Sequence, residues 1–428
     1  MLPSPRRVSE LAGTVCGIGG LLVLGIVFGV ELVTITIESL SVTFDFFGGA
    51  VSVFIATAIM VVGGAFVVRD VWRDPDADEK VLSGPDVCAV VPAYNDAEIV
   101  GVSVESLLDS EYDSLSVAVV TEPDDPRTRA KARELAEEHE SVTCLVNGNP
   151  GSKAGAINYA VEWSDADYFT VFDADERVSP EFVPLAMTEL LGDADVFQGR
   201  RIPRPNGVVE TLAYCERIAV QTGYALGELG GFTHCQSSST AFTREAFETV
   251  GGYDDKLTED IDFSHKVYRA DLTVRQNRRC TTTMEAPHTV RDLWGQRKRW
   301  RIGHVEVADA RAREALDGDL GFSDLLSIGR AAGSMAAGAL MLIVVAQIPF
   351  LVAQDVESAF FVPYALVLAI VGSVWLKDVL EDRVVRPTWA VSLVPLVYLG
   401  HGVLTVKAFL EYYLTWDGEW YQVTKTEA

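Results

Sequence analysis

Two aspartates one residue apart, Asp173 and Asp175, come directly after the apolar run 168–172. Carboxylates spaced this way, in a turn that leaves a buried strand, can share a hard cation and a diphosphate. Mg²⁺ and Mn²⁺ prefer oxygen ligands and commonly take some of them from phosphate. Asp-x-Asp is common by chance, so its position after an apolar strand is what favours a site for Mg²⁺ or Mn²⁺ with a phosphorylated ligand.

A second acidic pair, Glu259 and Asp260, follows Thr258 and opens a helix that we expect to run through Tyr268. Capping of that helix accounts for at least one of the two acids. Alternatively, a carboxylate at this position can act as a general base that takes the proton from an attacking hydroxyl. Asp260 is our candidate for that base.

Small residues and one lysine make up the segment 151–158, which begins a helix expected over 152–163. Small residues let the backbone approach a ligand, and a helix N-terminus beside Lys153 favours a phosphate group. The glycine spacing differs from that of a Walker A loop. The segment therefore predicts a phosphate contact of another kind.

Two more polar segments follow apolar strands. Ala93 and Tyr94 lie at the end of the first strand, where a tyrosine can stack on a nucleobase or simply pack within its loop. Glu122 lies in the acidic segment 121–125 after the second strand. It can accept hydrogen bonds from a base or a ribose, or belong to a solvated acidic turn.

A basic and aromatic element, Gln296-Arg297-Lys298-Arg299-Trp300, lies just ahead of the second group of apolar stretches. Arginine can pair with a diphosphate, and tryptophan can stack on the face of a sugar. The alternative is a basic anchor at the cytoplasmic membrane surface. Both can hold if Arg297, Lys298 and Arg301 form the anchor while Gln296, Arg299 and Trp300 face the site.

The elements that must position these residues alternate along the chain. Short apolar runs predict strands over 87–91, 115–121, 142–146 and 168–172, and helical spacing predicts helices over 98–108, 127–139, 152–163 and 180–191. Strands separated by helices of this length indicate an α/β fold, a mostly parallel sheet with helices on both faces. Ligands of such sheets bind beyond the carboxyl ends of the strands, where several of the polar motifs begin.

Nearly uncharged stretches flank this region, and each is close to the roughly 20 apolar residues that cross a bilayer. They are 11–30, 46–68, 331–353, 359–376 and 389–409. Basic residues near the span ends (Arg6 and Arg7, then Arg69 and Arg73) place 70–327 in the cytoplasm. Five spans would leave the C-terminus outside, and buried helices of a soluble protein are the less favoured alternative.

The chain has 428 residues and a net charge of -26, with 61 acidic against 35 basic residues. The acidic residues are spread along the chain, and such a field excludes nucleic acid as a partner. A scattered acidic surface fits a salty cytoplasm, where screening removes self-repulsion, so we expect a halophilic archaeon as the source. The six cysteines are scattered without metal-finger spacing and are expected to be reduced thiols.

The order of the motifs between residues 87 and 300 resembles that of the family 2 glycosyltransferases with the GT-A fold. The Gln-x-x-Arg-Trp element with apolar stretches on both sides is similar to the membrane-bound synthases of cellulose, chitin, hyaluronan and poly-N-acetylglucosamine. The segment 415–428 is similar to terminal patterns in some of these synthases. Each motif alone is weakly specific, but five in order are specific.

The resemblance implies a role for each candidate. Asp175 would bind the metal and Asp173 the UDP moiety, while Asp260 would be the base of an inverting transfer. Ala93, Tyr94, Glu122 and Lys153 would contact the nucleotide sugar, although Glu-Pro-Asp-Asp stands here in place of the common Asp-Asp-Gly-Ser. The remaining set, near the diphosphate and the acceptor, would be Glu259, Gln296, Arg299 and Trp300. Loops around 198–201 and 236–239 would lie near the acceptor.

This gives a plasma-membrane enzyme with a cytoplasmic catalytic domain, whose partners are a nucleotide-sugar donor, a glycan or lipid-linked acceptor and membrane lipids. Its expected parts are a hairpin (1–72), the transferase domain (85–304), an interfacial amphipathic segment (305–328), a second membrane region (329–414) and a tail (415–428). The open alternatives are processive polymer synthesis, single transfer to a polyprenyl phosphate or lipid-linked glycan, and, remotely, a transporter with a metal-sensing domain. The sequence leaves the oligomeric state open.

Overall fold

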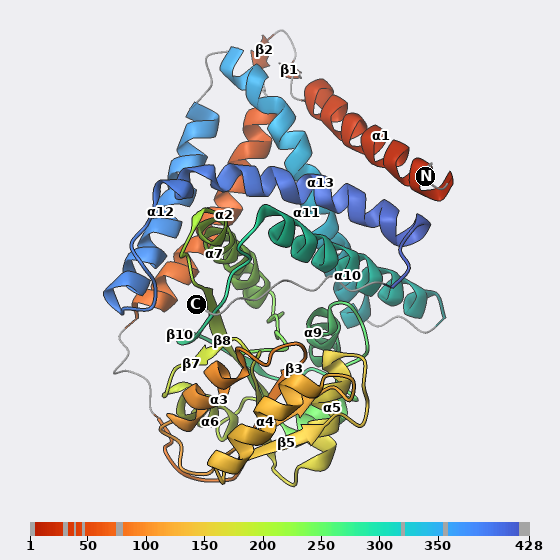
Figure 1. The fold of residues 1–428 in the computed structure, drawn as a ribbon. Helices are drawn as coiled ribbons and strands as arrows, with labels where there is room; N and C mark the ends of the chain where they lie inside the picture. The colour runs from red at the N-terminus through yellow and green to blue at the C-terminus, as the bar shows by residue number, and fades with distance from the viewer. Residues whose placement is uncertain are drawn as a thin grey trace.

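A computed structural model describes residues 5–28, 33–37, 40–44, 48–73, 80–317, 322–353 and 358–418. An α/β domain occupies one end of the molecule, and a group of long helices lies above it in Figure 1. The last ten residues of the predicted tail, and the acidic residues Glu31, Glu38 and Asp45 between the first two spans, lie outside the described residues.

An eight-stranded sheet forms the centre of the domain, in the order β5-β4-β3-β6-β9-β8-β10-β7. Strands β5, β4, β3 and β6 are parallel neighbours, as are β8 and β10. Strand β9 runs antiparallel to β6 and β8, and β7 runs antiparallel to β10. The strands are β3 (Val87–Ala93), β4 (Leu115–Thr121), β5 (Val142–Val146), β6 (Tyr168–Val171), β7 (Arg177–Val178), β8 (Val196–Pro203), β9 (Thr240–Thr243) and β10 (Val274–Met284).

The prediction of a mostly parallel sheet is therefore confirmed in part: the sheet is mixed, because β9 and β7 run antiparallel to their neighbours. The four predicted strands are confirmed to within two residues at each end. Strands β8 and β10 escaped notice because both contain arginines inside the strand, so they form no apolar run. The predicted loop at 198–201 is wrong for this reason, since these residues lie within β8.

Helices cover both faces of the sheet, as predicted. Buried residues of α3, α4 and α6 pack on one face, and those of α5, α8 and α9 pack on the other. These helices are α3 (Val100–Leu108), α4 (Pro126–Glu138), α5 (Lys153–Trp163), α6 (Phe182–Leu190), α8 (Arg244–Thr249) and α9 (Glu259–Arg269). Each of the four predicted helices is present, with its ends shifted by no more than two residues.

The remaining helices are longer. Helix α7 packs against α2 and α12 in a third apolar cluster, and α10 runs beside α13 (Figure 1). The predicted boundary at residue 304 falls inside α10. The elements are α1 (Pro5–Phe28), the antiparallel pair β1 (Val33–Ile37) and β2 (Leu40–Phe44), α2 (Gly48–Trp72), α7 (Val208–Leu229), α10 (Val290–Asp317), α11 (Phe322–Ala353), α12 (Ser358–Leu380) and α13 (Val394–Leu414), which follows the 3₁₀ turn Trp389–Leu393.

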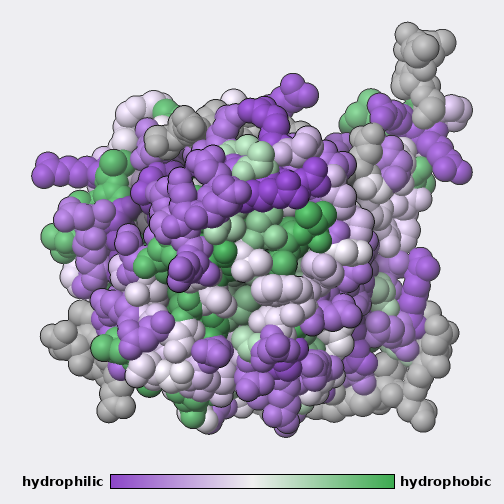
Figure 2. Space-filling view, turned by 60° about the horizontal axis from the view of Figure 1, so that its bottom comes forward, coloured by the Kyte–Doolittle hydropathy of each residue, from purple (hydrophilic) through white to green (hydrophobic). Residues whose placement is uncertain are grey.

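All five predicted apolar stretches coincide largely with helices. Within the described part of the chain, two segments are long and apolar enough to cross a membrane by length and composition, Pro5–Leu24 and Asp324–Pro349. Large apolar side chains on these helices are exposed, among them Leu11 at 67% and Leu340 at 54%. By contrast, hydrophilic side chains dominate much of the face seen in Figure 2, with hydrophobic ones gathered near its centre. The number of spans stays a prediction.

A buried ion pair joins the sheet to α12. Arg200 of β8 (2% exposed) pairs with Asp378 (0% exposed), which also accepts a hydrogen bond from the Tyr214 hydroxyl at 2.7 Å. We expect Arg200→Met to lower the free energy of unfolding by about 3–5 kcal/mol, because it leaves a buried carboxylate with only the more distant Arg383, at 3.8 Å, as its cation. Thermal unfolding in detergent measures this loss. The control is Arg275→Met, which breaks the exposed pair with Asp193 and should cost no more than about 1 kcal/mol. Equal losses in the two variants would contradict the prediction.

Candidate active site

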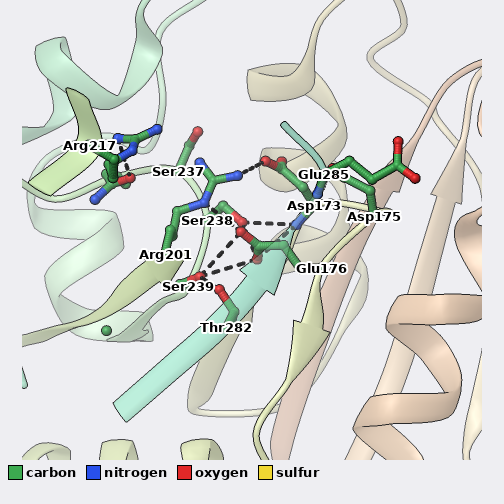
Figure 3. A network of polar contacts seen from close by, with 12 residues as sticks. Asp173, Asp175, Glu176, Arg201, Arg217, Ser237, Ser238, Ser239, Thr282 and Glu285 are labelled. Atoms are coloured by element: carbon green, nitrogen blue, oxygen red, sulfur yellow. Dashed lines mark hydrogen bonds and ion pairs between the residues drawn. The ribbon is translucent and has the colours of Figure 1, made fainter. Parts of the chain in front are cut away.

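Asp173 lies just beyond the carboxyl end of β6, and two cations hold its carboxylate. Lys153 pairs with one oxygen and Arg201 with the other. Its backbone N–H donates to the Ser238 hydroxyl at 2.9 Å. Figure 3 shows Arg201 reaching from its strand to Asp173, with the serine loop alongside. Residues from β6, β8, α5 and the loop before β9 therefore meet at this point.

The turn before α5 places Lys153 at the first position of the helix. The Ser152 hydroxyl caps the helix by accepting from the Gly155 N–H at 3.1 Å. A side chain at Gly155 would come within 2.1 Å of the Asn149 carbonyl oxygen, so glycine is required there. Gly151 has a φ of +110°, which favours glycine as well. The small residues thus serve the tight turn that brings Lys153 to Asp173.

Glu176, three residues after Asp173, is a site residue that sequence reasoning missed. It is fully buried, pairs with Arg201 and accepts from the Ser238 hydroxyl at 2.6 Å. Burial raises the pKa of Glu176, and the charge of Arg201 opposes that rise. Arg201 therefore bridges two carboxylates and is itself held in place. In the sequence, the only sign of Glu176 was that it is the third acid in Asp-Ala-Asp-Glu. Its partner Arg201 lies 25 residues away on another strand.

Asp175 is 6% exposed, and one of its oxygens accepts the Glu285 backbone N–H at 3.3 Å. Figure 3 shows Asp175 and Glu285 side by side at the edge of the network. Carboxylate oxygens suit Mg²⁺ or Mn²⁺. Among the described residues no group of three or more His, Cys, Asp or Glu could hold a metal. The donor set thus fits an ion that takes its other ligands from a bound diphosphate and water.

Asp260 lies in the first turn of α9. One oxygen accepts the Ile261 N–H at 2.8 Å, and the other lies 3.7 Å from Nε2 of His234. Burial alone would raise the pKa of Asp260, but His234 and the charge of Lys153 outweigh burial and lower it. His234 was missed because no local motif marks it. Its ring packs at a tilt against that of Tyr224, with centroids 4.4 Å apart.

Glu259 is in a different environment. It accepts from the Ser237 hydroxyl at 2.6 Å, and burial together with the charge of Asp260 raises its pKa. The pKa shifts of the two neighbouring carboxylates thus have opposite directions, upward for Glu259 and downward for Asp260. Such a separation is the pattern expected where one acid serves as a base.

Arg299 connects the two acidic motifs. Burial lowers the pKa of Arg299, while the charges of Glu259, Asp173 and Asp260 act in the opposite direction. Its guanidinium therefore lies within electrostatic reach of all three carboxylates. Lys153 likewise interacts with both Asp173 and Asp260. Arg299 and Lys153 therefore join two motifs that are more than 80 residues apart in the sequence into one site.

The other residues of the Gln296–Trp300 element contact neighbouring helices. Arg297 pairs with Glu216 of α7, and Lys298 pairs with Glu411 of α13 at 2.6 Å. Trp300 lies against the guanidinium groups of Arg297 and Arg217. Arg297 and Lys298 therefore fasten α10 to neighbouring helices, and an anchor at the membrane surface stays a prediction. Arg299 lies within electrostatic reach of the carboxylates.

The predicted nucleotide contacts lie at the carboxyl ends of β3 and β4. The carboxylate of Glu122 accepts from the Asn147 amide at 2.6 Å and from the Gly151 N–H at 2.9 Å, so it ties the turn before Lys153 to β4. Asp125 caps α4 and accepts the Asn95 N–H at 2.6 Å. Ala93 is buried, and Tyr94 next to it is half-buried. The acidic segment thus orders the loops at this edge, and nucleotide binding stays a prediction.

Comparison with known proteins adds independent findings. Residues 88–251 match the family model described as Glycosyl transferase family 2. The chain is 26% identical over 248 residues to the probable glycosyltransferase YdaM of Bacillus subtilis, which covers 55% of this chain and 58% of that protein. It is 27% identical over 229 residues to a poly-beta-1,6-N-acetyl-D-glucosamine synthase of Staphylococcus epidermidis, covering 51% and 54%. The chain thus spans a little over half the length of these relatives.

Among solved structures, a mannosyltransferase from Pyrobaculum calidifontis in complex with GDP-Man and Mn²⁺ superposes with a TM-score of 0.49. It is 18% identical and covers 78% of this chain and 99% of that one. Glucosyl-3-phosphoglycerate synthase from Mycobacterium tuberculosis, with Mn²⁺, UDP and phosphoglyceric acid, has a TM-score of 0.38 at 16% identity, covering 51% and 77%.

The mixed sheet with helices on both faces and acidic motifs at its edge forms a GT-A-like glycosyltransferase domain. The chain contains a family 2 glycosyltransferase domain, which the match over residues 88–251 establishes and the named relatives support. The resemblance drawn from the motifs is therefore confirmed.

Proposed function

We propose that this protein transfers a sugar from a nucleotide-diphosphate sugar, with UDP as the expected nucleotide, to a glycan acceptor at the cytoplasmic face of the plasma membrane. The convergence of Lys153, Asp173, Arg201 and Asp260 carries the proposal. The family domain supports it, and so do relatives named as poly-N-acetylglucosamine synthases. The exposed apolar side chains of α1 and α11 support a multi-pass arrangement.

In the proposed reaction, Asp260 takes the proton of an acceptor hydroxyl as that oxygen attacks the anomeric carbon. The bond to the nucleoside diphosphate breaks on the opposite side, so the anomeric configuration inverts. Lys153, Arg201 and Arg299 stabilise the charge that develops on the leaving diphosphate, because fixed cations cost little reorganisation. A Mg²⁺ or Mn²⁺ ion held by Asp175, with help from Asp173, would offset part of the same charge.

Repeated transfer to one growing glycan is the form of the reaction that we favour. Two guanidinium groups lie against the Trp300 ring and hold its orientation, and an oriented indole can pack against a sugar of the acceptor. Single transfer to a polyprenyl phosphate or lipid-linked glycan differs from polymer synthesis in the length of its product.

The test is nucleotide release by membranes that contain the protein, at high salt, with a panel of UDP- and GDP-sugars and either Mg²⁺ or Mn²⁺. We expect one donor to release its nucleotide at a rate well above that of membranes lacking the protein. Product size then separates a polymer from a single addition, and product anomer analysis tests inversion. Absence of both release and binding for every donor would overturn the proposal.

A further inference from the structure

A buried carboxylate joins three helices outside the acidic motifs. Glu216 of α7 is 2% exposed and accepts from Nε of Arg297 with both oxygens, at 2.7 and 2.9 Å. Nη2 of Arg297 and Nε2 of His401 also donate to it. Arg297 belongs to α10 and His401 to α13. One carboxylate therefore fixes α10 relative to both α7 and α13.

The arginine held by Glu216 in turn contacts two members of the Gln296–Trp300 element. Its Nη1 donates to Oε1 of Gln296, and its guanidinium lies 4.2 Å from the centroid of the Trp300 ring. Arg217, next to Glu216 in α7, lies 5.3 Å from the same ring. The orientation of the Trp300 indole and the Gln296 amide therefore depends on an arginine whose own orientation Glu216 sets.

The histidine contact has a definite proton arrangement. Nδ1 of His401 lies 3.2 Å from Nη2 of Arg301, and arginine can only donate, so Nδ1 accepts. Nε2 is then the nitrogen that donates to Glu216. Burial would raise the pKa of Glu216, but Arg297 and His401 lower it well below the ordinary value. The carboxylate is thus ionised and multiply bonded, which a glutamine could not reproduce.

We propose that Glu216 is a positioning residue for the acceptor: through Arg297 it holds Trp300 and Gln296 in the orientation that receives the acceptor next to Asp260. The inference rests on the proposed function. Glu216 has no direct part in binding the nucleotide sugar, because the groups assigned to that task (Lys153, Asp173 and Arg201) are held by contacts of their own.

The experiment compares sugar transfer with hydrolysis of the donor by water. Glu216→Gln keeps the size of the side chain and removes its charge. We expect transfer to the acceptor to fall by about 10- to 100-fold, the cost of a misplaced reactant, with a raised KM for the acceptor. Donor binding should stay unchanged, and donor hydrolysis should fall less than transfer because Lys153 and Arg201 keep their contacts, so the ratio of transfer to hydrolysis falls. General loss of structure would lower both activities together.

Glu228→Gln is the matched control. Glu228 lies in the same helix and also pairs with a buried arginine, Arg278. Arg278 belongs to β10 and pairs with Asp70 of α2 as well, so Glu228 links α7 to β10 and α2. We expect its transfer-to-hydrolysis ratio to equal that of the native protein. Glu216→Asp, which keeps the charge, should recover part of the loss.

A double variant tests whether the two residues act as a unit. Glu216→Gln combined with Arg297→Gln should lose no more transfer than either single change, because each removes the same contact. Multiplying losses would overturn the inference, as would an unchanged ratio in Glu216→Gln or a parallel loss of donor binding. If Glu216→Gln does not fold, Arg297→Lys takes its place, since lysine keeps the charge but lacks the forked geometry. Failure of the native protein to turn over any donor would instead count against the proposed function.

Discussion

Asp260→Asn is expected to abolish most sugar transfer while leaving the nucleotide sugar bound. General-base catalysis typically contributes about 10²- to 10⁴-fold, and asparagine cannot take the proton of the acceptor hydroxyl. His234, the charge of Lys153 and the Ile261 N–H lower the pKa of this carboxylate and so favour the ionised form that a base needs. The measurement is kcat for transfer, with donor affinity determined in the same preparation. A fall in kcat at constant donor affinity is the signature of an interaction made in the transition state.

Two variants control for the position of the charge. Asp255→Asn removes an exposed acid from the turn before α9 and should leave kcat unchanged. Glu259→Gln removes the neighbouring carboxylate, whose pKa is raised by burial and by the charge of Asp260. If Glu259→Gln lost more transfer than Asp260→Asn, the roles of the two acids would have to be exchanged.

The sequence was sufficient where a feature is local. The strand before Asp173 is a continuous apolar run, and the turn before Lys153 contains the glycines that its backbone needs. Helix α5 and strand β4 could therefore be located nearly to the residue. The order of such motifs along the chain was enough to recognise the family.

Long-range contacts decide the rest. The sequence of β10 is rich in arginine and threonine, whose side chains contact other elements in the structure. It therefore shows no periodic apolar pattern. His234 approaches Asp260 from a loop, and Arg201 reaches Asp173 from an adjacent part of the sheet. Nothing in the residues around His234 marks it, since its role depends on a neighbour 26 positions away. The predicted acidic residues thus lie close to groups that the sequence did not reveal and that set their charge, and their roles stay predictions.

Asp175→Asn, and removal of divalent metal from the native protein, should have the second large effect. The carboxylate of Asp175 is the buried oxygen donor best placed for a cation at the end of β6, and metal stabilisation of a leaving diphosphate is worth several kcal/mol. Loss of about 3 kcal/mol lowers kcat/KM by roughly 100-fold. We also expect the Mn²⁺ concentration for half-maximal activity to rise by at least about 10-fold. Substitutions of residues outside the coordination sphere can already lower metal affinity by that factor.

The decisive comparison for this second prediction is with Asp167→Asn. Asp167 is an exposed acid at the opposite end of β6, so its substitution changes the net charge equally without touching the metal-binding edge. A shifted Mn²⁺ dependence in Asp175→Asn alone ties the metal to the carboxyl end of the strand. If a chelator left the native protein active, the reaction would have to rely on Lys153, Arg201 and Arg299 to stabilise the diphosphate. Asp173 and Asp175 would then serve to hold those cations in place, and Asp175→Asn would lower stability more than it lowers turnover.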